Sequence, residues 1–486
     1  MNEPKREDAT RHALVTGATG YIGSKVVSAL IEQGWAVRAF SRSRDKAESM
    51  PYSERIVPEH DTAHAGEVEV FVGDASSQDD LRHALEDVDV AWYLLHSMGD
   101  SEEDFVTAER NMAQRFISAA EDAQISRVVY LGGLHPDDQE LSAHLVSRVK
   151  VGQVFLESSV PAACLQAGVV IGEGSSSFTM LRHAAERLPG VIGPDWIRNQ
   201  ITPIAVDDAI FYLTRAANLP AELNRTFDIG GPDTLAYSDM LKTYSRVTKL
   251  PTHPVVTAPI LNQQIAARGL ALVTPIDLGL INALMGSLLH HTVVKERDLE
   301  GLVGQPEGGN TAFAEAIAKA TEHTDTRRWF KVVAGVGSAV AATAVAGSVL
   351  TKPDNRWYKR LRKPAFQPPA WVFPEAWSAL YLDIAGMSSL VIADHLEKEQ
   401  TTQARSYATA LGANLVLNAG WCGLFFRARR PWLSTAGAGA LALSSLDLTR
   451  RTWKSSPERG AVLSLYAAWT TFATVLSGAI AAKNEG

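Results

Sequence analysis

The pattern of apolar and polar positions in the first third of the chain alternates between two kinds of segment. Short apolar runs predict β-strands at 12–16, 36–40, 68–72, 90–95, 127–131 and 162–171. Segments with a helical period lie between them, at 24–33, 77–87, 105–123 and from about 141, and Ser77 is a predicted N-cap. Strands that alternate with helices are typical of a parallel sheet covered on both faces. The pattern therefore predicts an α/β doubly wound Rossmann-like domain.

We expect this domain to occupy residues 11–325, after a polar tail at 1–10. Its cofactor half would be 11–150 and its substrate side 151–325. The first residues contain no apolar run of the kind found in a signal peptide, so we expect this domain to be cytoplasmic.

The pattern changes after residue 329, where long apolar stretches replace the alternation. Each stretch is long enough to span a bilayer as a helix, and they lie at about 332–350, 371–393, 406–426, 431–448 and 461–482. Residues 329–486 are therefore predicted to form an all-α bundle of five transmembrane helices, which makes the protein a multi-pass protein of the cell membrane. The proline- and aromatic-rich stretch 357–381 predicts a stiff loop that leads into a helix starting near Ala370.

Charge and tryptophan divide the chain in the same way. Residues 327–486 hold 19 Lys/Arg and 9 Asp/Glu, whereas the rest holds 27 and 45, and eight of the eleven tryptophans lie from Trp329 onward. The net charge of -8 and the absence of a basic domain motif give no reason to expect a nucleic-acid partner. Two isolated cysteines, Cys164 and Cys422, exclude a disulfide framework or a cysteine metal site, and no metal-ligand spacing is present.

A glycine-rich turn follows the first predicted strand. Gly17, Gly20 and Gly23 have the spacing that allows a tight turn, a close approach of the backbone to a pyrophosphate, and close packing of a helix on the strand. The helix N-terminus that follows favours an anion. We therefore expect a dinucleotide to bind here, in contact with Gly17, Thr19, Gly20, Tyr21, Ile22 and Gly23.

The end of the second strand indicates which dinucleotide it is. NAD-binding proteins usually place an acid there, whereas this chain has Arg42, followed by Arg44. Arg42, and Arg44 as a second candidate, would pair with a 2′-phosphate, so NADP(H) is preferred over NAD(H). Asp74, after the third strand, is a candidate contact to the adenine, and helix capping is the alternative.

The segments Val15–Gly23, Tyr93–Met98, Tyr130–Leu134 and Leu141–Arg148 resemble the atypical, extended, NmrA-like short-chain dehydrogenase/reductases (SDR). Three further segments extend the match to about residue 320: Ser175–Arg182, Pro203–Asp208 and Phe227–Pro232. The resemblance implies an NAD(P)-binding oxidoreductase whose active site has a Ser and a Tyr-x-x-x-Lys pair. Here Gly132 and Gly133 occupy the serine region, and His144 and Arg148 have the spacing of the pair. His144 could act as acid or base and Arg148 could hold the cofactor ribose; the alternative is a surface histidine.

Weaker candidates surround this pair. Ser147 and His96 would lie near the nicotinamide, and the resemblance places the region after Gly172 over the pocket. Four side chains could face that pocket: Arg182, His183, Trp196 and Arg198. The neighbours His290 and His291 are interpreted as structural.

The second half resembles the TspO/MBR family of tryptophan-rich sensory or translocator proteins. The resemblance rests on Trp357–Tyr381, on Asn414–Phe426 and on Tyr466–Leu476, although Leu465 replaces a usual proline and Ser477 a usual asparagine. It implies binding of a porphyrin, haem or a lipid-like hydrophobic ligand, and a homodimer. The residues it suggests for the ligand pocket are Trp371, Trp377, Tyr381, Asn414, Trp421, Tyr466 and Trp469, for which helix packing or an interfacial belt is the alternative.

Three hypotheses for the whole chain remain open at this point. The first is a membrane-anchored NADP-dependent oxidoreductase with a porphyrin-binding bundle. The second is a sensor that binds NADPH without turnover, which the missing Ser and Tyr favour. The third is two independent activities in one chain. Two acids within apolar helices, Asp383 and Asp447, are expected to be functional or paired.

Overall fold

The computed structural model describes residues 10–95, 102–137, 140–252, 254–258 and 262–484. The chain forms two compact units, each described by itself. Unit 1 comprises 1–267 and 276–324, and unit 2 comprises 268–275 and 325–486.

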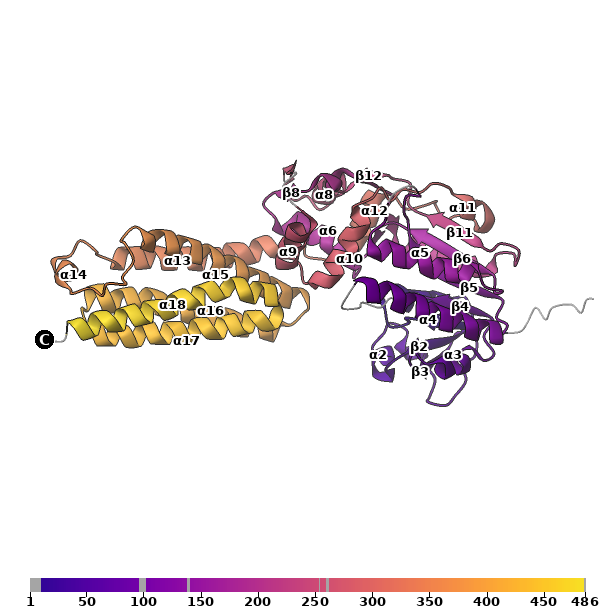
Figure 1. Ribbon diagram of the computed structural model, residues 1–486, viewed down its shortest axis with the longest axis horizontal. Coiled ribbons are helices and arrows are strands. Elements are labelled where there is room, and N and C mark those ends of the chain that lie inside the picture. Colours follow the sequence, from indigo (N-terminus) through magenta and orange to yellow (C-terminus); the bar gives the residue numbers. More distant parts are fainter. Residues whose placement is uncertain (1–9, 96–101, 138–139, 253, 259–261, 485–486) are drawn as a thin grey trace, which may run out of the picture. The chain divides into compact units, whose positions relative to one another are not determined.

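Unit 1 is built from strands that alternate with helices, as predicted (Figure 1). Its central strands are β1 (His12–Thr16), β2 (Ala36–Ser41), β3 (Val68–Val72), β4 (Val90–Tyr93), β5 (Arg127–Gly133), β6 (Ala162–Ala167) and β11 (Arg225–Ile229). The helices among them are α1 (Tyr21–Glu32), α2 (Arg44–Glu48), α3 (Gln78–Leu85), α4 (Glu102–Asp122), α5 (Ala143–Leu156), α6 (Ser176–Arg187), α7 (Val206–Arg215) and α8 (Tyr237–Val247). Ser77 caps α3 by accepting a hydrogen bond from the Asp80 amide, so the predicted cap is confirmed.

The seven strands form one parallel sheet in the order β11-β6-β5-β4-β1-β2-β3. The order reverses between β1 and β4, and a ligand of a doubly wound sheet binds outside the carboxyl ends of the strands at such a point. The predicted doubly wound fold is confirmed.

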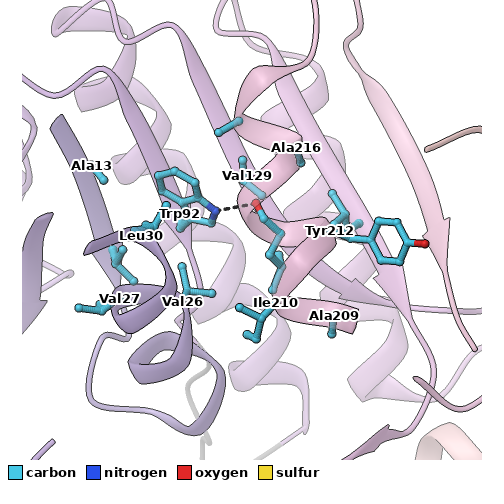
Figure 2. Packing of buried hydrophobic residues seen from close by; sticks show 14 of the residues in the cluster. Ala13, Val26, Val27, Leu30, Trp92, Val129, Ala209, Ile210, Tyr212 and Ala216 are labelled. Atoms are coloured by element: carbon cyan, nitrogen blue, oxygen red, sulfur yellow. Dashed lines mark hydrogen bonds between the residues drawn. The ribbon is translucent and has the colours of Figure 1, made fainter. Parts of the chain in front are cut away.

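Both faces of the sheet are covered because neighbouring residues of each strand point to opposite sides. Along β4, Trp92 packs with α1 and α7, whereas Tyr93 packs with α4 and α5. Figure 2 shows the first of these cores, in which the Trp92 indole Nε1 donates to the Leu213 carbonyl oxygen at 2.9 Å. The indole therefore fixes α7 to the centre of the sheet.

The later part of unit 1 adds shorter elements. They are β7 (Val170–Ile171), β8 (Val191–Gly193), β9 (Gln200–Ile201), β10 (Ile204–Ala205), β12 (Leu235–Ala236), β13 (Val255–Thr257), α10 (Leu278–Leu288), α11 (Asp298–Val303) and α12 (Phe313–Ala320). Helix α9 (Gln263–Val273) begins in unit 1 and ends in unit 2.

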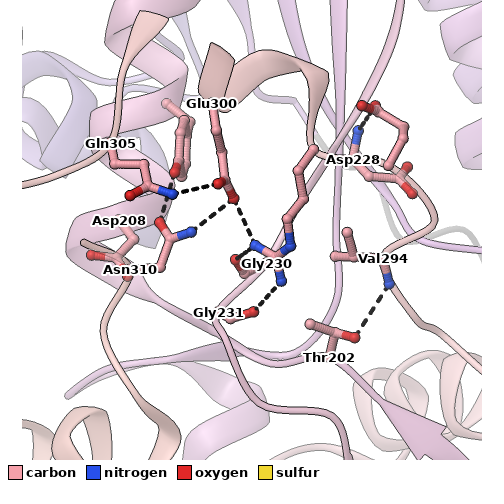
Figure 3. A network of polar contacts seen from close by, with 12 residues as sticks. Thr202, Asp208, Asp228, Gly230, Gly231, Val294, Glu300, Gln305 and Asn310 are labelled. Carbon is pink, nitrogen blue, oxygen red and sulfur yellow. Dashed lines mark hydrogen bonds and ion pairs between the residues drawn. The ribbon is translucent and has the colours of Figure 1, made fainter.

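A polar network fixes the segment around α11 to the end of β11 (Figure 3). Arg297 donates to the carbonyl oxygens of Gly230 and Gly231, at 3.3 and 2.8 Å, and pairs with Glu300 at 2.6 Å. Glu300 also accepts from the Asn310 amide at 2.8 Å. Because these bonds reach residues far apart in the chain, they hold the C-terminal part of unit 1 against the sheet.

Unit 2 is a bundle of long helices: α13 (Arg328–Leu350), α15 (Val372–Glu397), α16 (Thr401–Cys422, continued by a π-helical turn at Gly423–Arg427), α17 (Pro431–Ser455) and α18 (Pro457–Lys483). Among the described residues, four helices are long and apolar enough to cross a membrane, not the predicted five. The exception is α17, in which Asp447 and scattered glycine, serine and threonine residues lower the hydropathy. Large apolar side chains such as Leu443 are nevertheless exposed on its surface.

The loop between α13 and α15 also differs from the prediction. A short helix, α14 (Arg356–Arg360), forms before the first proline of this stretch, and Asn355 caps it by accepting from the Trp357 amide at 3.0 Å. The next helix, α15, begins at Val372, close to the predicted start.

Candidate functional site

A cleft of about 800 Å³ opens in unit 1 at the carboxyl ends of the parallel strands. It runs from the ends of β2 and β3, past β1 and β4, to β5 and β6. All eight residues predicted to bind the cofactor and both residues of the predicted catalytic pair line it: Gly17, Thr19, Gly20, Tyr21, Ile22, Gly23, Arg42, Asp74, His144 and Arg148.

The glycine turn at the centre of the cleft cannot carry side chains at two of its positions. Gly17 has a φ of +67°, and a β-carbon on it would lie 2.6 Å from the Leu94 carbonyl oxygen. A β-carbon on Gly23 would lie 2.1 Å from the Gly17 carbonyl oxygen. The N-cap of α1 is Gly20, which has no side chain, and the first turn of α1 has no acid. The amides there can therefore receive an anion, and the residues present fit a dinucleotide.

Two cations line the cleft at the end of β2, and they are not the pair considered from the sequence. Arg42 and Lys46 are exposed and line the cleft. Arg44 is bound elsewhere, because it pairs with Glu48 at 2.8 Å and donates to the Val57 carbonyl oxygen at 3.0 Å. The suggestion of Arg44 was therefore wrong. Arg42 lies between β2 and the N-cap of α2, Ser43, and Lys46 lies in α2.

Asp74 lies across the same end of the cleft. Its carboxylate accepts from the Ser76 amide at 2.8 Å, and this bond lowers the pKa of Asp74, with Arg42 contributing more weakly. Ser77, not Asp74, caps α3. Asp74 is thus a charged acceptor held in place by its own turn.

The pair His144 and Arg148 lies on the first turns of α5, at the other end of the cleft. Arg148 Nη1 donates to the Leu131 carbonyl oxygen of β5 at 3.5 Å, and the Tyr130 hydroxyl donates to the Arg148 carbonyl oxygen at 3.2 Å. Both bonds hold α5 to β5, and α5 contains no tyrosine.

The weaker candidates are distributed differently. The Ser147 hydroxyl is buried and donates to Glu109 of α4, so Ser147 does not line the cleft and the prediction for it was wrong. His96 lies outside the described residues. The four side chains suggested for the pocket are not among the described lining residues: Arg182 hydrogen-bonds to His183 at 2.9 Å and Arg198 to Thr257 at 2.9 Å, and Trp196 also lies elsewhere.

The wall beyond α5 is formed partly by the region after Gly172, which the resemblance places over the pocket, and partly by residues that the sequence did not single out. It comprises Ser175, Ser176, Ser177 and Met180 at the start of α6, Tyr237 at the start of α8, Leu284, Ser287 and Leu288 of α10, and Thr292. A β-carbon on Gly286 would lie 3.1 Å from the Ser142 hydroxyl oxygen, so α10 packs closely against the start of α5. This contact is made at Ser142, two residues before His144 in the chain.

In unit 2, three of the predicted ligand residues belong to one hydrogen-bonded chain. The Tyr381 hydroxyl donates to Asn418 at 2.8 Å, Asn418 donates to the Tyr466 hydroxyl at 3.2 Å, and Tyr466 donates to Asn414 at 2.8 Å. Asn414 then donates to Ser445 at 3.1 Å. These side chains link α15, α16, α18 and α17 through the centre of the bundle.

The tryptophans lie in three different surroundings. Trp377 is tilted against Tyr381 at 5.6 Å, and Trp469 lies at an edge of Phe373 at 6.1 Å, both beside the main apolar core. Trp421 stacks on Phe425 in the π-helical turn at 5.6 Å. Trp371 has 70% of its surface exposed. The four indoles therefore do not form one compact group.

The two acids in these helices also differ. Asp447 pairs with Arg450 and Arg451, at 2.8 and 2.5 Å. Both carboxylate oxygens of Asp383 are buried and accept no hydrogen bond from the residues that the structure describes.

Comparison with known proteins agrees with this division. A family model described as NAD(P)H-binding matches residues 17–184. Solved structures with a similar fold include a Citrobacter sp. triphenylmethane reductase (16% identity, TM-score 0.49, covering 64% of this chain and 99% of that one) and a Bacillus cereus UDP-glucuronic acid 4-epimerase with NAD (15%, TM-score 0.48, 64% and 98%). The family match identifies the part of unit 1 at residues 17–184 as an NAD(P)-binding domain.

The second half matches the TspO/MBR family model over residues 335–482. It is similar to the tryptophan-rich sensory protein of Cereibacter sphaeroides, with 34% identity over 150 residues, 29% of this chain and 83% of the relative. It is also similar to the translocator protein of Ovis aries, with 32% identity over 138 residues, 27% of this chain and 76% of the relative. This chain, which carries an NAD(P)-binding domain in its first half, belongs through residues 335–482 to the TspO/MBR family.

Proposed function

We propose that unit 1 is an NADP(H)-dependent oxidoreductase anchored to the membrane by a TspO/MBR bundle that binds a porphyrin or another hydrophobic ligand. The observation that supports it is the single cleft that brings together the glycine turn, the cations Arg42 and Lys46, and the pair His144 and Arg148. The cations would hold the 2′-phosphate, and the amides at the start of α1 would hold the pyrophosphate.

At the other end of the cleft, the nicotinamide supplies or accepts a hydride when it is bound. Arg148 cannot release a proton at neutral pH and is positioned by β5, so its role would be to hold the ribose. The His144 imidazole would move a proton to or from the substrate oxygen. The strand-end glycines Gly132 and Gly133 line the cleft beside this pair and present no side chain to it.

The bundle offers aromatic faces for a planar ligand around Trp377, Tyr381 and Trp469. We place unit 1 in the cytoplasm, where NADP(H) is available, and we expect a homodimer through the bundle as the family resemblance implies.

A sensor that binds NADPH without turnover is the second candidate function, and the absence of a tyrosine from α5 favours it. The test is NADPH oxidation by the full-length protein in nanodiscs with a panel of carbonyl compounds. The oxidoreductase predicts turnover that falls at least about tenfold in His144→Ala with NADPH affinity retained. Tight NADPH binding with no oxidation in any reaction would support the sensor instead.

Porphyrin binding needs a separate measurement, the quenching of tryptophan fluorescence by protoporphyrin IX. Trp377→Phe and Trp469→Phe should weaken saturable quenching more than Trp371→Phe does, because Trp371 is exposed. The titration with and without NADPH also tests whether the two units are coupled, since any coupling must be reciprocal. Affinities indifferent to the second ligand would indicate independent activities.

A further inference from the structure

Several buried tyrosines of unit 1 have a described hydrogen-bond partner for the hydroxyl. Tyr52, Tyr130, Tyr212 and Tyr244 donate to Ala18, Arg148, Asn310 and Glu186, respectively. The hydroxyls of Tyr237 and Tyr21 are buried and have no hydrogen-bond partner among the described residues. Tyr21 belongs to the glycine turn, whereas Tyr237 belongs to the wall beyond α5. Only 5% of Tyr237 is exposed, and its side chain lines the cleft.

An unpaired buried hydroxyl is unfavourable, so a group that completes its hydrogen bonding is expected in the space it borders. Tyr237 is fixed in position because it is the first residue of α8, and the preceding strand β12 pairs with β9. The fold therefore places the Tyr237 side chain at the cleft that His144 also lines.

The chemistry of this wall restricts what can bind there. Among the described residues that line the cleft, the fully charged ones are Arg42, Lys46 and Asp74 at the β2–β3 end, and Arg148 at β5. The wall beyond α5 has the apolar side chains of Met180, Leu284 and Leu288 and the hydroxyl groups of Ser175, Ser176, Ser177, Tyr237, Ser287 and Thr292; Leu134 and Leu145 also line this end of the cleft. An anion bound there would meet no cation among these residues, so its desolvation would be uncompensated.

We propose that the substrate of unit 1 is an uncharged, largely apolar molecule with an oxygen that accepts a hydrogen bond, and that Tyr237 donates this bond. The proposal rests on the proposed oxidoreductase function and assigns Tyr237 the role of binding and orienting the substrate oxygen beside His144. A carbonyl compound with an aromatic or alicyclic body meets these conditions.

The test uses three probes of the same shape: acetylnaphthalene, ethylnaphthalene and naphthoate, all substituted at the same ring carbon. Binding is measured by calorimetry on full-length protein saturated with NADP⁺, which has no hydride to give to the ketone. Acetylnaphthalene should bind, and naphthoate should bind roughly tenfold or more weakly. Tyr237→Phe should weaken binding of the ketone about fivefold and leave the affinity for ethylnaphthalene unchanged.

Tyr244→Phe is the matched control on the same helix, since its hydroxyl already donates to Glu186 at 2.5 Å and it does not line the cleft. It should leave the affinity of all three probes unchanged. The melting temperature of Tyr237→Phe without ligand should equal or exceed that of the wild type, because an unpaired hydroxyl is removed.

Two results for Tyr237→Phe would mean that Tyr237 is structural and would overturn the proposal. One is equal weakening of ketone binding and hydrocarbon binding, and the other is a lower melting temperature with unchanged ketone binding. So would NADP⁺ binding with no affinity for acetylnaphthalene, or equal affinity for naphthoate. Failure of NADP⁺ itself to bind would instead contradict the proposed function.

Discussion

A β-carbon on Gly23 would lie 2.1 Å from the carbonyl oxygen of Gly17, well inside van der Waals contact. The first turn of α1 therefore packs directly on the turn that leaves β1, and this contact determines the shape of the central part of the cleft.

Gly23→Ala should consequently move the glycine turn. We expect unit 1 to lose about 1–3 kcal/mol of stability and NADPH affinity to fall at least about tenfold. Gly301→Ala in α11 is the control, because no other group lies within 4 Å of the added β-carbon. NADPH titration and thermal melting of both variants check the prediction, which an unchanged NADPH affinity in Gly23→Ala would contradict.

Burial lowers the pKa of His290 below its ordinary value of 6.5. As the pH falls through about 6.5, the unfolded chain therefore binds a proton at His290 before the folded protein does. His290 has no such effect on the free energy of unfolding above this pH, and it lowers that free energy increasingly below it. We expect His290→Gln to reduce the acid slope of stability by up to about 1.4 kcal/mol per pH unit. The measurement is the melting temperature at a series of pH values, with His64→Gln in an exposed loop as the control. The same pH dependence in both variants would contradict the prediction.

Asn418 bridges Tyr381 and Tyr466 at the centre of the bundle. Asn418→Leu leaves two tyrosine hydroxyls with one fewer partner, and we expect a loss of about 1–2 kcal/mol of bundle stability. Thr409→Ala, an exposed position on the same helix, should have little effect. Unfolding of the bundle in detergent compares them, and equal stability of the two variants would argue against a structural role for the chain of hydrogen bonds.

Arg459 is fully buried in unit 2 and pairs with Asp394 at 2.5 Å. Its guanidinium also donates to the carbonyl oxygens of Leu272 and Thr274, at 2.7 and 2.9 Å, and so holds the segment 268–275. Arg459→Met should cost about 3–5 kcal/mol because Asp394 loses this buried partner. The exposed pair of Arg450 with Asp447 gives a comparison, and Arg450→Met should cost at most about 1 kcal/mol.

Hydrogen exchange reports on the same change locally. In Arg459→Met, amide exchange in 268–275 should be faster than in the wild type, whereas Arg450→Met should leave it unchanged. Equal protection of this segment in all three proteins would show that the Arg459 bonds do not hold it.

The sequence was sufficient where the signal is local. The strands β1 and β3, the Ser77 cap and the glycine turn were predicted because apolar runs, caps and φ > 0 positions are recorded in a few neighbouring residues. The cleft residues at the ends of β1, β2 and β3 follow from the same pattern, because all parallel strands end at one edge of the sheet.

The sequence was insufficient where the position of a side chain depends on tertiary packing. Which of Arg44 and Lys46 faces the cleft depends on how α2 lies, and whether Ser147 faces the cofactor or Glu109 depends on the rotation of α5. Tyr237 is far from His144 along the chain, and only the folding of α8 brings both to one cleft. A fifth span was predicted from the length of the apolar stretch that became α17, although its polar residues lower the hydropathy.

Cofactor preference is expected to depend on the β2 end of the cleft. Arg42 and Lys46 line the cleft there, whereas Arg44 pairs with Glu48. Arg42→Ala and Lys46→Ala should each weaken NADPH binding about tenfold or more and leave NADH binding nearly unchanged, because only NADPH carries the 2′-phosphate. Arg44→Ala, whose side chain pairs with Glu48, should affect neither cofactor.

The most direct test is therefore a titration of full-length protein in nanodiscs with NADPH and with NADH, followed by cofactor fluorescence. The account predicts saturable binding of both, with NADPH bound at least about tenfold more tightly and the difference lost in the Arg42→Ala, Lys46→Ala double variant. Absence of saturable NADPH binding, or a preference for NADPH that survives both substitutions, would contradict it.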